Sequence, residues 1–65
     1  MKTTEWKGYE DAGGFFRLRK GELEVIPMLE SGHMDASDPI LVDFDGIDPE
    51  DAERCRGIKA ELEAK

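Results

Sequence analysis

The chain has no lysine or arginine between Glu22 and Glu53, although nine of its 65 residues are basic. It has one cysteine, one histidine and no apolar run near the roughly 20 residues that a membrane span needs. A single cysteine cannot form an internal disulfide, and one Cys with one His gives too few ligands for a closed zinc site. The sequence therefore excludes a disulfide-stapled scaffold and predicts no membrane association and no metal or other cofactor.

The first residues lack the apolar stretch of a secretory signal, so we expect a cytoplasmic location. With only 65 residues, we expect one small domain, residues 1–65, that acts as a monomer. The core of so short a chain rarely supplies more than about 3–5 kcal/mol of stability. Five aromatic residues, together with the aliphatic ones, are enough to form one such core.

Negative charge is concentrated in the middle of the chain. The flanking segments 1–21 and 54–65 each carry a net charge of +2, whereas residues 22–53 carry −11, and together these charges give the formal −7. The eleven carboxylates of this block are Glu22, Glu24, Glu30, Asp35, Asp38, Asp43, Asp45, Asp48, Glu50, Asp51 and Glu53. No catalytic motif accompanies them. The block therefore indicates which kind of partner the protein attracts, and it does not indicate a reaction.

Residues 15–25 predict a β-hairpin with a two-residue loop at Lys20-Gly21. This loop sets one register, in which charged residues pair on one face and apolar residues on the other. The predicted pairs are Arg19 with Glu22, Leu18 with Leu23, Arg17 with Glu24, and Phe16 with Val25. The agreement between charge and hydrophobic pattern supports this register.

Other segments complete an α+β fold. Residues 3–9 and 40–44 favour strands, and residues 28–39 form a polar connection with room for one helical turn. A helix from Pro49 to about Ala64 is predicted, with Asp48 as its N-cap. Gly57 has two interpretations, a helix-interior glycine that costs about 1 kcal/mol relative to Ala or a point of close packing on the sheet. Its apolar stripe is Ala52, Cys55, Ile58 and Leu62. We predict a three- to four-stranded antiparallel sheet with one C-terminal helix packed on one face.

Enzymatic and metal-binding interpretations find little support. When Gly46 is aligned with the glycine of an EF-hand loop, Leu41 and Ala52 fall where calcium ligands are needed. His33 has no nucleophile paired with it in the sequence, and Cys55 lies on the apolar stripe, where a buried and inert thiol is expected. The sequence therefore predicts that the protein is not an enzyme.

Two interpretations of the acids remain open. They are either a solvated surface that keeps a small protein in solution, or a surface that binds a positively charged partner. Direct binding of nucleic acid is not expected, because phosphates repel an acidic chain. In the second interpretation the acids imitate the phosphates of DNA and occupy a basic groove. The candidate partner-binding residues are then Glu30, Asp35, Asp38, Asp43, Asp45, Asp48, Glu50, Asp51 and Glu53.

The chain resembles the small acidic anti-CRISPR proteins encoded by phages, in particular those that act on type I-C systems. The resemblance covers the whole chain and is carried by its length, its lone cysteine, its α+β pattern and its segregated acids, rather than by a motif. It implies an inhibitor that docks on the basic surface with which a CRISPR effector complex reads the protospacer-adjacent motif or grips target DNA. No enzymatic step is implied, and the resemblance places the protein in the cytoplasm of an infected bacterial host.

An alternative function is a small protein–protein interaction module. In that case apolar residues carry the binding and the acids serve solubility only. The residues that would make this contact are Trp6, Tyr9, Met28 and Met34. Trp6 and Tyr9 are equally compatible with anchoring the core. For Met28, Leu29 and Met34, the sequence favours filling gaps under the helix over forming an apolar contact patch.

Overall fold

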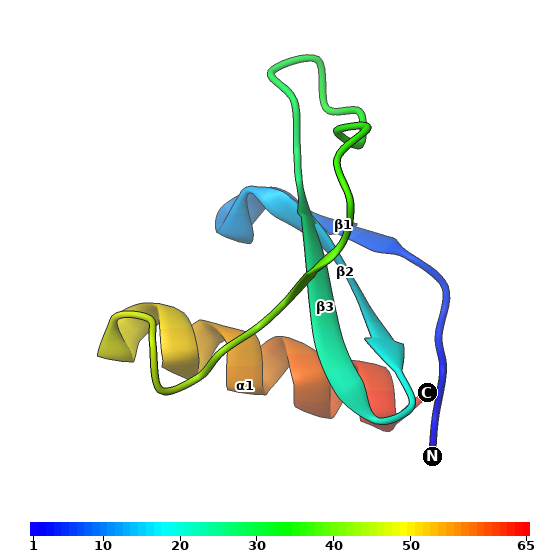
Figure 1. Ribbon diagram of the computed structural model, residues 1–65, viewed down its shortest axis with the longest axis vertical. Coiled ribbons are helices and arrows are strands. Elements are labelled where there is room, and N and C mark those ends of the chain that lie inside the picture. The colour runs from blue at the N-terminus through cyan, green and yellow to red at the C-terminus, as the bar shows by residue number, and fades with distance from the viewer.

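The computed structural model, which describes residues 1–65, is a four-stranded antiparallel sheet with one α-helix across one face (Figure 1). The strands lie in the sheet in the order in which they occur in the sequence. The elements are β1 (Lys7–Tyr9), the 3-10 turn η1 (Glu10–Ala12), β2 (Gly14–Arg19), β3 (Glu22–Pro27), β4 (Ile40–Leu41) and α1 (Pro49–Glu63). The predicted fold class is confirmed.

The β2–β3 hairpin has the predicted register. Its charged pairs are Arg17 with Glu24 and Arg19 with Glu22, and its inner pair is Leu18 with Leu23. Lys20 and Gly21 have φ values of 52° and 82°, as a tight hairpin turn requires at both central positions. Glycine adopts a positive φ without steric cost, so Gly21 fits this turn directly.

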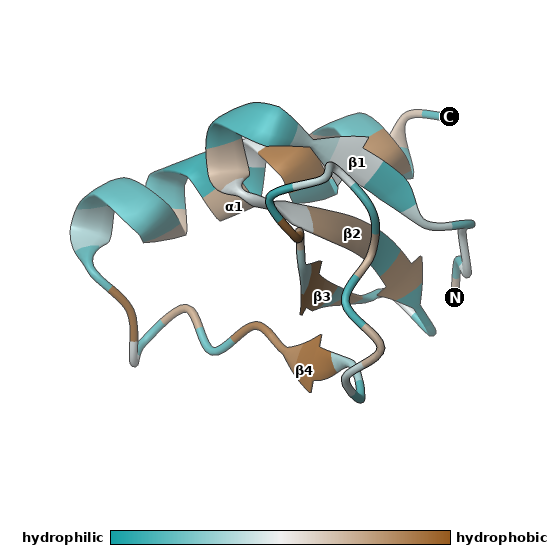
Figure 2. Ribbon diagram, turned by 90° about the horizontal axis from the view of Figure 1, so that it is seen from above, coloured by the Kyte–Doolittle hydropathy of each residue, from teal (hydrophilic) through white to brown (hydrophobic).

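The core lies between this hairpin and α1. Leu18, Leu23 and Leu62 are the most deeply buried side chains, and each contributes about 1.5–3 kcal/mol by leaving water. The four residues of the predicted helical stripe are all buried. In Figure 2 the hydrophobic strands β2 and β3 lie beneath a helix whose outer surface is largely hydrophilic. The one-sided pattern of the sequence is thus satisfied by a two-layer structure.

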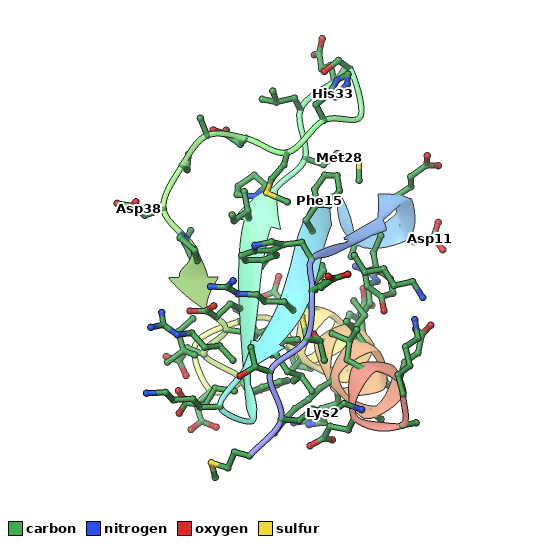
Figure 3. The ribbon with its side chains drawn as sticks, turned by 90° about the vertical axis from the view of Figure 1, so that its right-hand side faces the viewer. Lys2, Asp11, Phe15, Met28, His33 and Asp38 are labelled. Atoms are coloured by element: carbon green, nitrogen blue, oxygen red, sulfur yellow. The ribbon has the colours of Figure 1, made fainter.

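The opposite sheet face, here called the outer face, carries a second set of apolar side chains. The Arg17 guanidinium lies over the Trp6 ring, 4.5 Å from its centre, and donates a hydrogen bond to Glu24 at 2.8 Å. Phe15 and Met28 lie near one another at the far end of this face from α1, both against Gly8 (Figure 3). Met28 therefore packs away from the helix, and the prediction that it fills gaps under the helix is wrong.

The two edge strands are shorter than predicted. The N-terminal segment follows β2 from Thr4 onward, but there the Thr4 hydroxyl accepts the Leu18 N–H at 2.9 Å in place of a backbone carbonyl. At the other edge, the Asp43 carboxylate accepts the Asp45 N–H at 3.1 Å. This turn competes with sheet pairing, so β4 stops at Leu41 instead of continuing to residue 44.

The connection between β3 and β4 contains no helical turn. Met28 and Met34 form an isolated bridge, and the Leu29 N–H donates to the His33 carbonyl at 2.8 Å. The chain thus folds back on itself as a small β-loop that projects from one end of the molecule (Figure 1). Residues 28–39 are called the projecting loop below.

Of the two interpretations of Gly57, close packing on the sheet is wrong. A Cβ atom placed on this glycine meets no atom within 4 Å. The reason is that Ala52, Cys55, Ile58 and Leu62 make the contact with the sheet, while Gly57 lies on the exposed side. The residue keeps the conformational cost of a helical glycine without a packing benefit.

We therefore predict that Gly57→Ala stabilises the protein by about 1 kcal/mol, the difference in helix propensity between the two residues. Urea unfolding followed by circular dichroism measures this change. Gly14→Ala is the matched control, because its Cβ would lie 3.0 Å from Val25 Cγ2 and 3.1 Å from the Ile26 carbonyl oxygen. It should destabilise the fold. A loss of stability in Gly57→Ala would contradict the open environment described for this position.

Candidate acidic binding surface

The structure divides the candidate carboxylates into two groups. Glu30, Asp35 and Asp38 belong to the projecting loop at one end of the long axis. The other group lies in the turn after β4 and the first turns of α1, towards the opposite end (Figure 1). This second group, called the acidic segment, comprises Asp43, Asp45, Asp48, Glu50, Asp51 and Glu53. The two groups are not brought together into one cluster.

The remaining acids of the mid-chain block lie opposite basic residues in the hairpin. Glu24 is largely buried and forms an ion pair with Arg17 at 2.8 Å. Glu22 lies directly opposite Arg19 in the β2–β3 register. The Glu24 carboxylate is therefore matched within the fold, whereas Glu22 is exposed and forms no ion pair. Both residues help to specify the register of the hairpin.

The acids of the projecting loop are partly engaged in local structure. Asp35 accepts hydrogen bonds from the Ser37 N–H at 3.0 Å and the Ser37 hydroxyl at 2.8 Å, so its carboxylate holds a turn. Glu30 and Asp38 are exposed and have no ion pair. His33 is exposed near the end of this loop, where its Nδ1 lies 3.1 Å from the Ser31 hydroxyl (Figure 3).

The acidic segment concentrates charge more strongly than any other part of the molecule. It holds six carboxylates in eleven residues, and all six side chains are exposed. Only Asp51 has an ion pair, with Arg54 at 3.2 Å, and this pair is itself exposed to solvent. An exposed pair of this kind contributes at most about 1 kcal/mol, so the segment stays strongly negative.

Secondary structure explains why the segment is ordered. Asp43 holds the turn with its carboxylate and its carbonyl, which accepts the Gly46 N–H at 3.1 Å. Asp48 is the N-cap and Pro49 the first helical residue, as predicted. The Asp48 carboxylate accepts no capping hydrogen bond, although its carbonyl accepts the Ala52 N–H at 2.8 Å. This carboxylate is consequently free to contact another molecule.

The start of α1 also lowers the cost of holding these charges. Glu50 and Asp51 lie in the first turn, where the positive end of the helix dipole favours an acid by about 0.3–1 kcal/mol. Glu50 and Glu53 are three residues apart and therefore neighbours on the helix surface. The fold thus presents an ordered row of negative charge that attracts cations at a distance of about one Debye length, roughly 10 Å at 0.1 M salt.

A polar contact at the other end of α1 was missed by the sequence analysis. The Glu61 carboxylate accepts hydrogen bonds from Lys7 Nζ at 2.7 Å and from the Tyr9 hydroxyl at 3.1 Å. The bond to Lys7 is the main reason that the pKa of Glu61 lies below its ordinary value and the pKa of Lys7 above its own. No local pattern could reveal this contact, because it joins residues more than fifty positions apart.

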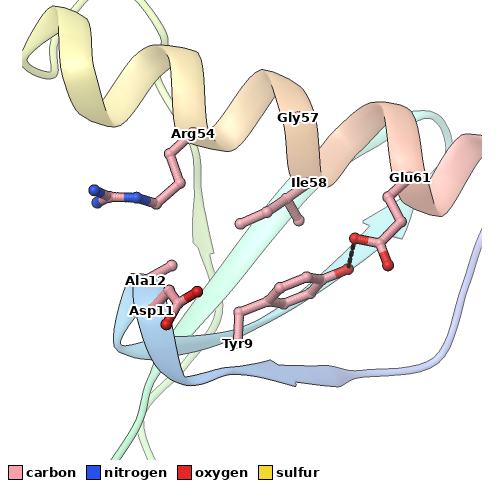
Figure 4. Close-up of a pocket in the computed structure, with 7 residues that line it drawn as sticks. All are labelled: Tyr9, Asp11, Ala12, Arg54, Gly57, Ile58 and Glu61. Carbon is pink, nitrogen blue, oxygen red and sulfur yellow. Dashed lines mark hydrogen bonds between the residues drawn. The ribbon is translucent and has the colours of Figure 1, made fainter.

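Beside this contact lies a groove of about 270 Å³ between η1 and α1 (Figure 4). Its apolar surface comes from Ala12, Ile58 and the Tyr9 ring. Asp11, Arg54, Gly57 and Glu61 complete the lining. We call this feature the Gly57 groove.

The structure supplies no arrangement typical of nucleophilic or metal chemistry. Cys55 is buried in the core, and burial raises the pKa of its thiol, so the reactive thiolate is disfavoured. No three His, Cys, Asp or Glu side chains come together in a way that could hold a metal ion. The helix α1 is not long and apolar enough to cross a membrane.

Comparison of the chain with protein-family models, curated proteins and solved structures finds no match in any of the three. Its function is therefore argued from its own residues.

The Glu61 contact predicts a specific dependence of stability on pH. Because the folded-state pKa of Glu61 is lowered, its contribution is present above the unfolded-state value of about 4.3 and is lost as the pH falls through the folded-state value. Glu61→Gln should therefore be less stable than the wild type near neutral pH, and this difference should shrink in acid. Urea unfolding at about pH 7 and about pH 3 measures it.

Glu63→Gln is the control for this experiment, because Glu63 is exposed on the same helix and its side chain forms no hydrogen bond or ion pair. Its effect on stability should be small at both pH values. An equal stability difference between Glu61→Gln and the wild type at both pH values would show that the carboxylate is not the titrating group.

Proposed function

We propose that the protein is a non-enzymatic inhibitor that uses the acidic segment to occupy a basic, nucleic-acid-binding surface of a prokaryotic defence complex. A CRISPR effector complex of type I is the favoured target, in keeping with the resemblance drawn from the sequence. The inhibitor would block target DNA by taking its place on the basic surface. The partner is accordingly a protein, and the inhibitor needs no cofactor.

The observation that carries this proposal is the row of exposed carboxylates over residues 43–53, with no basic residue among them. Duplex DNA presents one negative charge per about 1.7 Å of its axis, and proteins bind it through Lys and Arg. Carboxylates ordered by a turn and a helix start present comparable charge without the conformational cost that a disordered acidic tail would meet on binding. Like-charge repulsion within the segment offers the fold no stability, so a role in binding explains its presence better.

The projecting loop supplies a second, smaller group of acids in this proposal. Glu30 and Asp38 are exposed at the other end of the molecule, whose longest dimension is 30 Å. A partner whose basic groove is as long as the molecule would contact both groups. A shorter groove would contact the acidic segment alone, which is why the acidic segment is assigned the main role.

The proposal predicts that neutralising the acidic segment abolishes inhibition while the fold persists. The triple variant Asp48→Asn, Glu50→Gln and Glu53→Gln removes three charges that form no ion pair. Its potency should fall by a factor of ten or more, which corresponds to about 1.4 kcal/mol of lost binding free energy. The measurement is an electrophoretic mobility shift of target DNA by a purified type I-C effector complex at increasing inhibitor concentrations.

The triple variant Glu5→Gln, Glu10→Gln and Glu63→Gln removes the same charge from exposed positions outside the acidic segment. It should inhibit nearly as well as the wild type. Equal losses in the two triples would assign the effect to net charge rather than to the acidic segment. If the wild-type chain displaces no DNA from effector complexes of any type I system, the proposed target is wrong.

A second candidate function rests on the outer face. Trp6, Phe15, Met28 and Met34 are only partly buried, and Phe15 alternates with core residues along β2, so it points away from α1. Such a surface suits an interaction module that binds by apolar contact. Tyr9, in contrast, packs edge-on against Phe16 on the core side and is not part of this surface.

The two candidate functions differ in their response to salt and to Trp6→Ala. Binding through the acidic segment should weaken steeply between about 0.05 M and about 0.5 M salt, because the Debye length shortens over that range. It should also be little affected by Trp6→Ala. Binding through the outer face should resist salt and lose tenfold or more on Trp6→Ala, as expected for an aromatic anchor that contributes about 2 kcal/mol. The assay is surface plasmon resonance against the effector complex.

A further inference from the structure

The Gly57 groove has a wall whose composition the fold itself does not explain. Gly57 lies in the interior of α1, where glycine costs about fivefold in folding equilibrium relative to alanine. A Cβ at this position would meet no neighbouring atom within 4 Å, so packing does not require its absence. Gly57 is one of the residues that line the groove between α1 and η1 (Figure 4).

The groove combines an apolar surface with three charged residues, Asp11, Arg54 and Glu61. The methyl group of Ala12, the Ile58 side chain and the Tyr9 ring form the apolar surface. The Tyr9 hydroxyl is tied to Glu61 by the 3.1 Å hydrogen bond, so the ring is held as a fixed wall. This combination matches a long side chain with an aliphatic stem and a polar end.

The charges at the rim favour a cation at that end. Asp11 is exposed and forms no ion pair, and Glu61 provides a second carboxylate nearby. Arg54 also reaches the rim, but its guanidinium is paired with Asp51 at 3.2 Å. Lys7 is similarly committed to Glu61. The unmatched charge of the groove is therefore that of Asp11, which is negative.

We propose that the Gly57 groove binds one lysine or arginine side chain of the basic partner. The aliphatic stem lies against Ala12, Ile58 and the Tyr9 ring, and the cationic head reaches Asp11. The groove adjoins the acidic segment through the Asp51–Arg54 pair, so one partner can reach both. The identity of the occupant rests on the proposed function, whereas the preference of the groove for a cationic side chain can be tested without any partner.

The test is a titration of the 15N-labelled chain with three small probes, followed by the amide shifts in NMR spectra. N-acetyl-arginine amide and N-acetyl-lysine amide carry the cationic head, and N-acetyl-norleucine amide has an apolar stem without it. We expect saturable shifts centred on Ala12, Gly57 and Ile58 with both cationic probes. The norleucine probe should bind about fivefold more weakly or worse, since it lacks the contact with Asp11.

Two variants and one control locate the site. Gly57→Leu fills the groove and Asp11→Asn removes the rim charge, so each should weaken the cationic probes by about fivefold or more. Ala60→Leu adds the same side chain at an exposed position of α1 outside the groove and should bind as the wild type does. Asp11→Asn changes an exposed side chain without hydrogen bonds, so it tests the site even if Gly57→Leu unfolds.

Three results would overturn this assignment: shifts centred on residues 43–53, equal binding of the norleucine probe, or unchanged binding by Asp11→Asn. None of them depends on an effector complex. If the proposed function is wrong, the effector complex binds target DNA equally well with and without the inhibitor in the mobility-shift assay. The NMR titration with the small probes would still give the expected shifts. The two ideas can therefore fail separately.

Discussion

The register of the β2–β3 hairpin is the constraint on which the rest of the structure depends. A shift of β3 by one residue against β2 would move Leu23 to the outer face and turn Glu24 towards the core, while Leu18 stayed where it is. The turn at Lys20-Gly21 prevents this shift, because its two positive φ values define a two-residue connection. With the register set, one sheet face is apolar and has to be covered, and the C-terminal helix is the only element long enough to cover it. In a chain of this size, no second core could replace the one that forms there.

The same constraint determines where the acids are located. The chain must leave β4 and reach the far end of the apolar face before α1 begins, so residues 43–48 form a turn at the margin of the molecule. Aspartate suits that path, since Asp43 closes the turn and Asp48 takes the N-cap position. Local structure therefore explains why Asp43 and Asp48 are acids. It does not require carboxylates at Asp45 or Glu53, which form no hydrogen bond or ion pair.

Features set by neighbouring residues were predictable, and features set by distant ones were not. The hairpin and helix were predicted because turn chemistry, alternation and the 3.6-residue period act over a few positions. The extent of β4 was overestimated, because Asp43 diverts the chain before the strand pattern ends. The separation of the loop acids from the acidic segment depends on the direction of the projecting loop, which sequence alone does not specify. The bond of Glu61 to Lys7 requires the end of α1 to lie beside β1.

Charge that does not stabilise the fold is the strongest argument for a function of the acidic segment. Glu24 and Glu61 show how this protein uses a carboxylate structurally, since each receives a basic partner at 2.7–2.8 Å. The acidic segment has a single exposed ion pair for six acids. Its mutual repulsion is partly offset by the helix dipole, an effect that reaches only the first turn. In a small domain whose core supplies only a few kcal/mol, this repulsion lowers the stability of the free protein and has no benefit there. It becomes useful only when a cationic surface is present. Contact with such a surface would remove the repulsion, and binding free energy would then come from charges that the folded monomer leaves unmatched.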